Sequence, residues 1–398
     1  MNESLNIWYF YLDPNTSLSD PGNAPAIHIK ETIQALRQQG HQVKSFLHED
    51  LPSQGENALR RTSREFSLNH AAFRAIKPLL RDLYELYQNL QETRSLENAF
   101  RGQLPNLVYE RLAHNKSAVS TCAHRHDIPL IVENNAPVDE KKQYWGAPLD
   151  FATRSLEKTV LQRADAIAVV SSPLKKHYER LGIDARKIFV LSNGVNEENF
   201  SLDKVSLNIR SKLGLEEKLI IGFVGTIAPY HGVELFLSIA RAKLSSTAPL
   251  HFLIVGAGHG RDELSEAVKQ AHLDGQFTFI NPVPNAQVPN YLAAMDICLL
   301  PRFMWYGSPM KIFEYGIMGK VIVAPNQENI RDVLTHGETA LLFEPGNTDA
   351  LILTIQELCK DDALRIRLGI AARKHILANH TWTKNAERIL EIYHQIAD

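Results

Sequence analysis

Cysteine is scarce in this chain, with three such residues among 398. Cys122, Cys298 and Cys359 lie far apart in the sequence, and none belongs to a CxxC motif. A sparse, odd count argues against a disulfide framework and is typical of a protein in a reducing compartment. We therefore expect a cytoplasmic protein.

The chain also lacks a long apolar run and a strong excess of charge of either sign. No stretch of about 18 apolar residues occurs, so no transmembrane helix is expected. Met1–Tyr11 has an apolar patch, but it lacks the basic n-region and the length of a signal peptide. The formal net charge of −2 gives no electrostatic support for nucleic acid as a partner. With 44% hydrophobic and 22% charged residues, the chain reads as a globular protein long enough for two domains.

Short apolar runs alternate with segments of helical periodicity along the whole chain. Such alternation predicts an α/β protein with parallel sheets wound by crossover helices. The expected strands are residues 5–12, 41–47, 107–109, 129–132, 164–170, 188–191, 219–224, 250–255, 277–280, 297–300, 321–324 and 340–343. Helices are expected over residues 26–39, 115–127, 286–294, 348–359, 362–378 and 382–397.

Residues 58–101 form a long helical stretch with an apolar face and a basic first half. The preferred interpretation is a helical insertion that covers the first sheet. The alternative is an element that contributes to acceptor binding or lies on a membrane surface. The acidic second half of the stretch argues against a membrane.

Residues 305–319 connect two expected strands and contain a candidate anion site. Ser308 can cap a helix whose first helical position is Pro309. The start of such a helix, with Lys311 one turn in, favours a bound phosphate. Glu314 lies three residues after Lys311 and could accept hydrogen bonds from sugar hydroxyls. Together these residues predict a nucleotide-sugar pocket.

Polar side chains follow two expected strands of the first half. Glu110 and Arg111 follow the strand at 107–109, and Glu133 follows the strand at 129–132. In an open α/β sheet such strand ends line the ligand crevice. The first loop of the chain is not G-x-G-x-x-G, so a nicotinamide cofactor has little support. The run Gly256–Gly260 resembles a phosphate loop, but we interpret it mainly as a tight turn into a helix.

Several segments resemble the retaining glycosyltransferases of family 4, which have the GT-B fold. In the first half they are Gly40-His41-Gln42-Val43, Ile128 to Pro137, and Ser192-Asn193-Gly194-Val195; in the second half they are Gly222 to Thr226, His231-Gly232-Val233, Ser308 to Tyr315, and Gly319-Lys320-Val321. The resemblance implies two Rossmann-like domains that face each other across a cleft. We expect an acceptor domain at residues 1–195, a donor domain at 196–378, and a helix at 379–398 that packs back on the first domain.

The resemblance also implies the donor site, in which Glu314 binds the ribose of the nucleotide. The donor-binding set is Gly225, Thr226, His231, Val283, Gly307, Ser308, Pro309, Met310, Lys311 and Glu314. The first glutamate of the family's paired-glutamate motif falls at Tyr306, so one sugar contact is missing or differently supplied. The family's Arg and Lys fall at Thr226 and His231. Lys311, helped by Arg302, must then neutralise more of the phosphate charge, and His231 could add a partial positive charge.

Glycosyl transfer needs a stabilised diphosphate leaving group and a positioned acceptor hydroxyl. We expect Lys311 to serve the first need, and Glu133, Arg111 and His28 the second. In this fold the leaving phosphate can take the acceptor proton, so no protein nucleophile is required. No cofactor and no metal are expected, because no Asp-x-Asp motif is present. A nucleotide-sugar epimerase and an inactive nucleotide- or sugar-binding protein are the alternatives.

Overall fold

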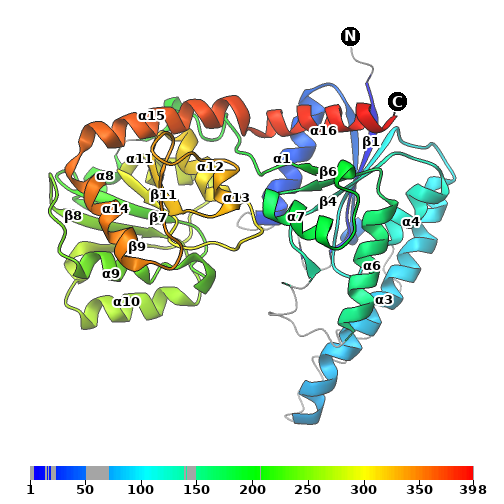
Figure 1. Ribbon diagram of the computed structural model, residues 1–398, viewed down its shortest axis with the longest axis horizontal. Helices are drawn as coiled ribbons and strands as arrows, with labels where there is room; N and C mark the ends of the chain where they lie inside the picture. The colour runs from blue at the N-terminus through cyan, green and yellow to red at the C-terminus, as the bar shows by residue number, and fades with distance from the viewer. Residues whose placement is uncertain are drawn as a thin grey trace. The chain divides into compact units, whose positions relative to one another are not determined.

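The computed structural model describes residues 4–13, 16, 18, 24–50, 71–138, 140, 149–206 and 208–397. The chain divides into two compact units, which are coloured by sequence in Figure 1. One unit comprises Met1–Leu191 and Ala386–Asp398, and the other comprises Ser192–Asn385. Within the described part of the chain, no helix has the length and apolar character needed to cross a membrane.

The first unit is built on a parallel sheet of six strands in the order β2-β1-β3-β4-β5-β6. The strands are β1 (Asn6–Tyr11), β2 (Gln42–Leu47), β3 (Leu107–Arg111), β4 (Leu130–Asn134), β5 (Ala166–Val169) and β6 (Ile188–Val190). Ile7 of β1 pairs with Val43 on one side and with Leu107 on the other. The chain therefore changes winding direction between β1 and β3, which is where open α/β sheets bind ligands.

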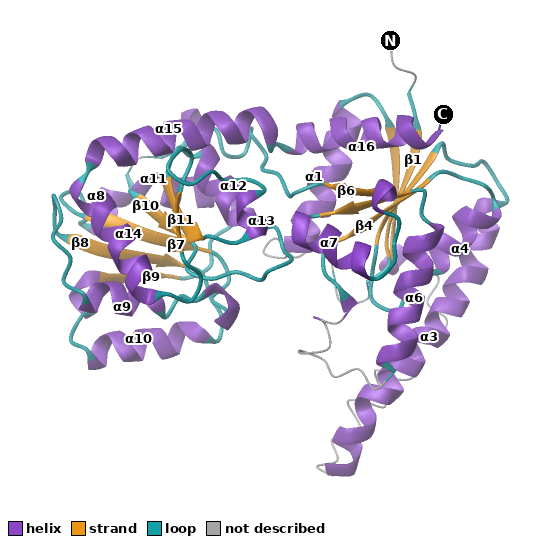
Figure 2. Ribbon diagram, in the orientation of Figure 1, coloured by secondary structure: helices purple, strands orange, loops and turns teal. Residues whose placement is uncertain are grey.

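Helices cover this sheet on both faces, as Figure 2 shows. They are α1 (Ala24–Gln38), α3 (Ala71–Phe100), α4 (Ala118–Arg125), α6 (Asp150–Arg163) and α7 (Ser172–Arg180). The expected helix at 58–101 is present from Ala71 onwards, and residues 58–70 lie outside the described residues. Its last residue, Phe100, packs edge-on against Trp8 of β1, with 5.1 Å between ring centroids.

The second unit has its own six-stranded parallel sheet, in the order β12-β11-β10-β7-β8-β9. The strands are β7 (Leu219–Val224), β8 (Leu250–Val255), β9 (Phe277–Ile280), β10 (Ile297–Leu299), β11 (Val321–Pro325) and β12 (Leu341–Phe343). This is the strand order of the nucleotide-binding Rossmann sheet, and its switch point lies between β7 and β10. The predicted α/β class with two Rossmann-like sheets is confirmed.

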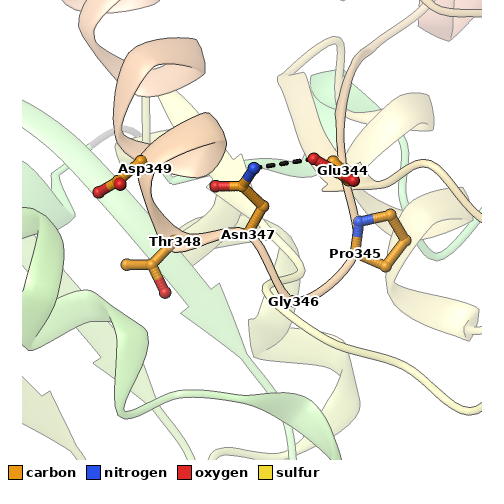
Figure 3. Close-up of a pocket in the computed structure, with 6 residues that line it drawn as sticks. All are labelled: Glu344, Pro345, Gly346, Asn347, Thr348 and Asp349. Atoms are coloured by element: carbon orange, nitrogen blue, oxygen red, sulfur yellow. Dashed lines mark hydrogen bonds between the residues drawn. The ribbon is translucent and has the colours of Figure 1, made fainter.

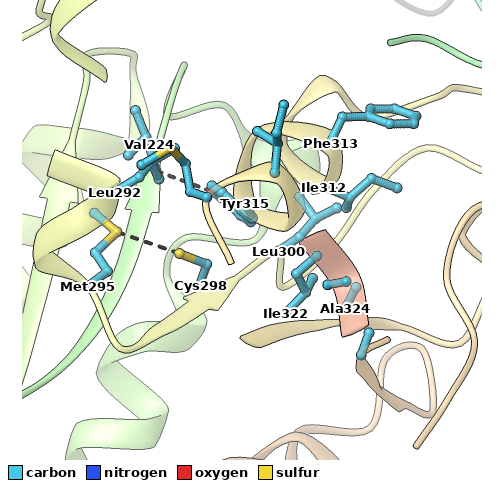
Figure 4. Packing of buried hydrophobic residues seen from close by; sticks show 14 of the residues in the cluster. Val224, Leu292, Met295, Cys298, Leu300, Ile312, Phe313, Tyr315, Ile322 and Ala324 are labelled. Atoms are coloured by element: carbon cyan, nitrogen blue, oxygen red, sulfur yellow. Dashed lines mark hydrogen bonds between the residues drawn. The ribbon is translucent and has the colours of Figure 1, made fainter. Parts of the chain in front are cut away.

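Eight helices within the described residues pack against the second sheet. They are α8 (Ile209–Leu213), α9 (Leu235–Arg241), α10 (Gly260–Gln270), α11 (Val288–Ala294), α12 (Met310–Ile317), α13 (Glu328–Arg331), α14 (Thr348–Lys360) and α15 (Asp362–Asn379). In Figure 4 the apolar face of α12 points into the core, where the Val224 amide donates to the Tyr315 hydroxyl. This packing fixes the start of α12 beside the end of β7.

The last helix, α16 (Trp382–Ala397), returns to the first unit, which contains its residues from Ala386 onwards. Its apolar face repeats at helical spacing and is buried through Ala386, Ile389 and Leu390. The burial of this face confirms the expected return of the C-terminal helix.

Candidate functional site

Lys311 lies at the start of α12, at the switch point of the second sheet. Its Nζ is 3.2 Å from His231 Nε2 and 5.1 Å from the ring centroid of Phe223, the residue before the last of β7. Gly225, directly after β7, has φ +135°, and a Cβ there would lie 2.6 Å from Lys311 Cε. The glycine is therefore required by its backbone conformation, and the lysine side chain passes directly over it.

His231 holds the ammonium group of Lys311 as a neutral acceptor. Because an ammonium group only donates hydrogen bonds, Nε2 of His231 accepts and the ring proton is on Nδ1. Nδ1 then donates to the carbonyl oxygen of Thr226 at 2.6 Å. Burial, followed by the charge of Lys311, lowers the pKa of His231 to about 3. The expected partial positive charge on His231 is therefore wrong at neutral pH.

Burial favours the neutral form of both the lysine and the glutamate of α12. Burial lowers the pKa of Lys311 to about 8, although the Glu314 carboxylate opposes this shift. Burial likewise raises the pKa of Glu314, and Lys311 opposes that shift. A lysine that is poorly solvated before a ligand arrives gains most from an anion, because the anion replaces the missing hydration.

The expected capping role of Ser308 is wrong. The helix is preceded by Pro309 at the cap position, in an extended conformation with ψ 115°, and no side chain caps it. Ser308 Oγ instead accepts from the amide of Asn193 at 3.0 Å, and Asn193 Nδ2 donates to the Ser308 carbonyl at 2.7 Å. The turn at Asn193 thus ties the loop before α12 to the start of the second unit.

Arg302 does not contribute to the charge beside Lys311 in the expected way. Its guanidinium forms a 2.9 Å ion pair with Glu234 and donates at 2.9 Å to the carbonyl of Pro229. Both partners belong to the loop and helix that follow β7. Arg302 therefore holds this loop in place, while Lys311 faces the glycine at Gly225.

The loop before α12 is held by a buried asparagine that the sequence pattern did not reveal. Asn329 Nδ2 donates to the carbonyls of Gly307 at 2.8 Å and Met304 at 2.9 Å. Tyr306, at the position of the family's first glutamate, is buried, and its hydroxyl lies 2.9 Å from Met304 Sδ. The position that resembles a sugar-binding carboxylate is thus occupied by a packed aromatic ring.

The remaining predicted donor residues lie around the same sheet edge. Met310 is the first residue of α12 and is half-buried. Val283, in the loop after β9, packs on the core cluster of the second unit. Gly256, after β8, approaches the loop after β7 so closely that a Cβ at position 256 would lie 2.0 Å from the Gly225 carbonyl oxygen. This contact supports the interpretation of Gly256–Gly260 as a packed turn.

A shallow hollow in the second unit, at the start of α14, is lined by none of the residues described around Lys311. It is lined by residues 344–349, which Figure 3 shows in close-up. Asn347 caps the helix by accepting from the amide of Ala350, and its Nδ2 donates to Glu344 at 2.8 Å. Its amide oxygen and nitrogen both serve the turn itself.

In the first unit, four side chains donate hydrogen bonds to Glu133. Its Oε2 accepts from Tyr109 at 2.7 Å and from His28 Nε2 at 3.0 Å. Its Oε1 accepts from Arg111 at 2.5 Å and from Asn135 at 2.6 Å. The structure thus brings together His28, Arg111 and Glu133, three residues that lie far apart in the sequence. Tyr109 was not predicted, because an aromatic residue in an apolar strand reads as core.

Glu133 is a buried carboxylate that is ionised at neutral pH. Burial alone would raise its pKa, but the charges of His28 and Arg111 hold the pKa of Glu133 well below its usual range. Burial likewise opposes the charge on Arg111, but Glu133 raises the pKa of Arg111 above its ordinary value. Because an ionised carboxylate only accepts, His28 Nε2 carries a proton and donates it to Glu133.

Strands β3 and β4 each extend two residues further than the sequence predicted. Glu110 and Arg111 are the last residues of β3, and Glu133 lies within β4. Since side chains alternate along a strand, Arg111 and Tyr109 share one face of the sheet and Glu110 points to the other. There, burial and the nearby Glu92 raise the pKa of Glu110 to about 8.

One group of described residues has the composition and spacing of a metal site. Asp82 and Glu85 of α3 and His114 after β3 offer ligand atoms that all lie within 4.8 Å of one another. Asn115 Nδ2 also donates to Glu85 at 2.8 Å. These residues belong to the first unit, whereas the Lys311 constellation belongs to the second.

Comparison with known proteins assigns both units to described families. A family model named "Glycosyltransferase Family 4" matches residues 26–199, and one named "Glycosyl transferases group 1" matches residues 205–375. The 2-deoxystreptamine N-acetyl-D-glucosaminyltransferase of Niallia circulans is 27% identical over 59% of this chain and 60% of the relative. The D-inositol 3-phosphate glycosyltransferase of Corynebacterium glutamicum is 25% identical over 67% of this chain and 66% of the relative. The chain thus spans less than two thirds of either relative.

Two solved structures share the fold over almost the whole chain. Sucrose-phosphate synthase from Thermosynechococcus elongatus superposes with a TM-score of 0.71 at 16% identity, covering 98% of this chain and 99% of that one. The Anabaena protein HepE, solved with UDP and glucose, superposes with a TM-score of 0.68 at 14% identity, covering 98% and 100%. At these identities the superpositions show the fold alone.

Proposed function

The chain belongs to the group 1 and family 4 glycosyltransferases, and we propose that it transfers a sugar from a uridine diphosphate sugar to an acceptor hydroxyl, with retention at the anomeric carbon. The observation that carries this proposal is the position of Lys311 over Gly225, at the switch point of a Rossmann sheet. The neutral His231 beside it leaves the ammonium group as the local positive charge for a diphosphate.

The leaving diphosphate is stabilised in this proposal by two groups. The first amides of α12 lack intrahelical acceptors and face an anion with the positive end of the helix dipole. The ammonium group of Lys311 adds a full charge at the same place. Glu314, on the next turn, accepts hydrogen bonds from the ribose hydroxyls, as the family resemblance implies. The buried Tyr306 leaves the sugar itself with one fewer carboxylate contact.

The acceptor side of the proposal rests on the Glu133 network of the first unit. All four donors around Glu133 are oriented by it, so the carboxylate positions Arg111 and His28 rather than attacking the sugar. The acceptor proton then passes to the leaving phosphate, and no covalent sugar–enzyme intermediate is needed. We propose a cyclitol as the first acceptor to test, because the two relatives are named for a deoxystreptamine and an inositol phosphate. The cytoplasmic location stays a prediction.

A panel of nucleotides tests the donor half of the proposal. We expect UDP to raise the thermal midpoint more than GDP, ADP or TDP, because a ligand that binds only the folded state stabilises it by about 2.7 kcal/mol at a hundredfold excess over Kd. For a unit of this size that corresponds to a shift of roughly 5–10 °C. UDP is favoured because HepE was solved with it. If no nucleotide raised the midpoint, the donor assignment would be wrong, whereas conversion of UDP-sugar without an acceptor would favour an epimerase.

The pH dependence of donor use is a second expected outcome. Lys311 must be protonated to bind the diphosphate, and its pKa in the free enzyme is about 8. Donor kcat/KM is therefore constant below pH 8 and falls about tenfold per pH unit above it, since bound diphosphate raises the lysine pKa. Lys311→Arg is the matched control, because a guanidinium stays charged across this range. An alkaline limb that persists unchanged in Lys311→Arg would assign the titration to another group.

A further inference from the structure

Helix α3 and the segment after β3 bring two carboxylates and an imidazole together in the first unit. Asp82 and Glu85 lie three positions apart on α3, so both project from the same face of the helix. Their oxygens and a ring nitrogen of His114 all lie within 4.8 Å of one another. Asp82 is fully buried, and the other two side chains are half-buried. These groups are ligands that a divalent cation accepts.

The helix face that carries the two carboxylates is bound to the start of α4 by specific contacts. Asn89 Oδ1 accepts from the amides of Ser117 at 2.8 Å and Ala118 at 3.0 Å. Glu92 forms a buried ion pair with Lys116. Figures 1 and 2 show α3 beside α4. These contacts fix the rotation of α3 about its axis, so its carboxylates are directed at the segment after β3 by the fold itself.

Hydrogen bonds orient the two carboxylates and are compatible with a bound cation. Asp82 Oδ2 accepts from the amide of Leu149 at 3.3 Å, and Glu85 Oε2 accepts from Asn115 Nδ2 at 2.8 Å. Each of these bonds uses one of about four lone-pair sites on a carboxylate. Hydrogen bonds to the ligands are usual around metal sites, where they hold the ligand atoms in place.

A buried amide oxygen beside these groups is a second observation that points to a cation. Asn115 is 3% exposed, and its Oδ1 has no hydrogen-bond partner among the residues that the structure describes. Such atoms are rare in folded proteins. A half-turn of the amide brings this oxygen to the position from which Nδ2 faces Glu85, and a cation between the two oxygens stabilises that arrangement. His114 and Asn115 also line a cavity of ≈ 10 Å³, which gives both side chains room to turn.

We propose that Asp82, Glu85 and His114 form a zinc site, with the amide oxygen of Asn115 as the fourth ligand. Imidazole and carboxylate together suit Zn²⁺, whereas Mg²⁺ and Ca²⁺ prefer oxygen ligands alone. Ligand atoms of a tetrahedral zinc ion lie roughly 3.4 Å apart at bond lengths of about 2.1 Å. Rotation of the side chains by about 1.4 Å or less therefore closes the site.

The zinc ion has a structural role in this proposal. Its charge balances two carboxylates, of which Asp82 is fully buried. It links α3 to the segment that follows β3, three residues beyond Arg111. The site is independent of donor use, which rests on Lys311 in the second unit. It is also separate from the donor-side metal that the missing Asp-x-Asp motif argues against.

Calorimetric titration of the untagged, EDTA-treated full chain with zinc chloride tests the site. We expect one zinc ion per chain with a Kd of about 1 µM or lower. Glu85→Gln and His114→Gln should each weaken binding by about a hundredfold or more. His124→Gln, at an exposed histidine of α4, is the matched control and should bind zinc like the wild type. Zinc should raise the thermal midpoint of the wild type and the control, but of neither ligand variant.

Asn115→Asp separates a zinc site from a cluster held only by ion pairs and hydrogen bonds. It places a third carboxylate beside Glu85, so without zinc its thermal midpoint should be lower than that of the wild type. With zinc it should bind more tightly than the wild type, because a carboxylate replaces an amide oxygen.

Three results would overturn the proposal. A wild type that binds no zinc would leave Asp82, Glu85 and His114 as an ion-paired cluster. Equal affinities in the wild type, Glu85→Gln and His114→Gln would place bound zinc elsewhere. Tighter binding of Mg²⁺ than of Zn²⁺, measured by the same titration, would contradict the role of the imidazole as a ligand.

Discussion

Lys311→Ala should lower kcat/KM for sugar transfer by about a thousandfold and abolish the UDP-induced thermal shift. The variant loses the ammonium group next to the leaving diphosphate, and charge stabilisation of this kind contributes about 10²–10³ in rate. The loss in kcat/KM should be larger than that from removing one hydrogen bond, because neither Arg302 nor His231 can replace the charge. Arg302 is paired with Glu234, and His231 is neutral. Steady-state kinetics with saturating acceptor provide the measurement.

Two controls separate this effect from damage to the fold. Lys269→Ala removes an exposed lysine from α10 of the same unit and should leave both kinetics and thermal midpoint unchanged. Lys311→Ala itself should unfold no earlier than the wild type, since removal of a buried ammonium with a lowered pKa relieves a desolvation cost. Activity within tenfold of the wild type would remove Lys311 from the donor site.

The strands of the second sheet could be predicted from the sequence because each is a short apolar run between turn residues. Strands β7, β8 and β9 begin and end where the pattern predicted. The ends of the strands in the first sheet were harder to predict. Arg111 and Glu133 continue β3 and β4 after the apolar run of each strand has ended. The backbone of a polar residue can pair with the neighbouring strand whatever its side chain is. The local sequence pattern therefore does not show where such a strand ends.

The site was readable only where its residues are close in sequence. Lys311 and Glu314 were predicted as a pair because one helix turn separates them, and their role in donor binding stays a prediction. Asn193 and Asn329 were missed, since their hydrogen bonds to the loop before α12 join positions 115 and 22 residues apart. The charge of His231 was misjudged for a related reason: its burial depends on the tertiary structure, and burial decides its protonation.

The Glu133 network illustrates the same limit in the first unit. Its members come from α1, β3, β4 and the residue that follows β4, which meet only because β1, β3 and β4 are neighbours in the sheet. The sequence suggested that polar residues gather at the strand ends, but not that one carboxylate would bind four donors. That arrangement makes the stability of the first unit and the orientation of Arg111 and His28 depend on one ionised group.

Glu133→Gln should lower the free energy of unfolding by about 3–5 kcal/mol at pH 7, because it leaves Arg111 buried without its counter-charge. The amide nitrogen also faces donors rather than acceptors. Since the pKa of Glu133 is lowered in the folded state, its stabilising contribution is present above the ordinary value of 4.5 and is lost as the pH falls through the folded pKa. The gap between variant and wild type should therefore narrow in acid. Urea unfolding at several pH values measures it.

Glu110→Gln is the matched substitution, and the two carboxyl groups make opposite predictions. Both are buried near the ends of neighbouring strands, but the pKa of Glu110 is raised to about 8, so at pH 7 the folded protein holds it protonated. Its stabilising protonation is complete below 4.5 and is lost as the pH rises toward 8, and a neutral amide removes this dependence. Stability at pH 7 should thus be unchanged or higher in Glu110→Gln. Equal losses in both variants would mean that strand position, rather than the Arg111 and His28 charges, decides the role of Glu133.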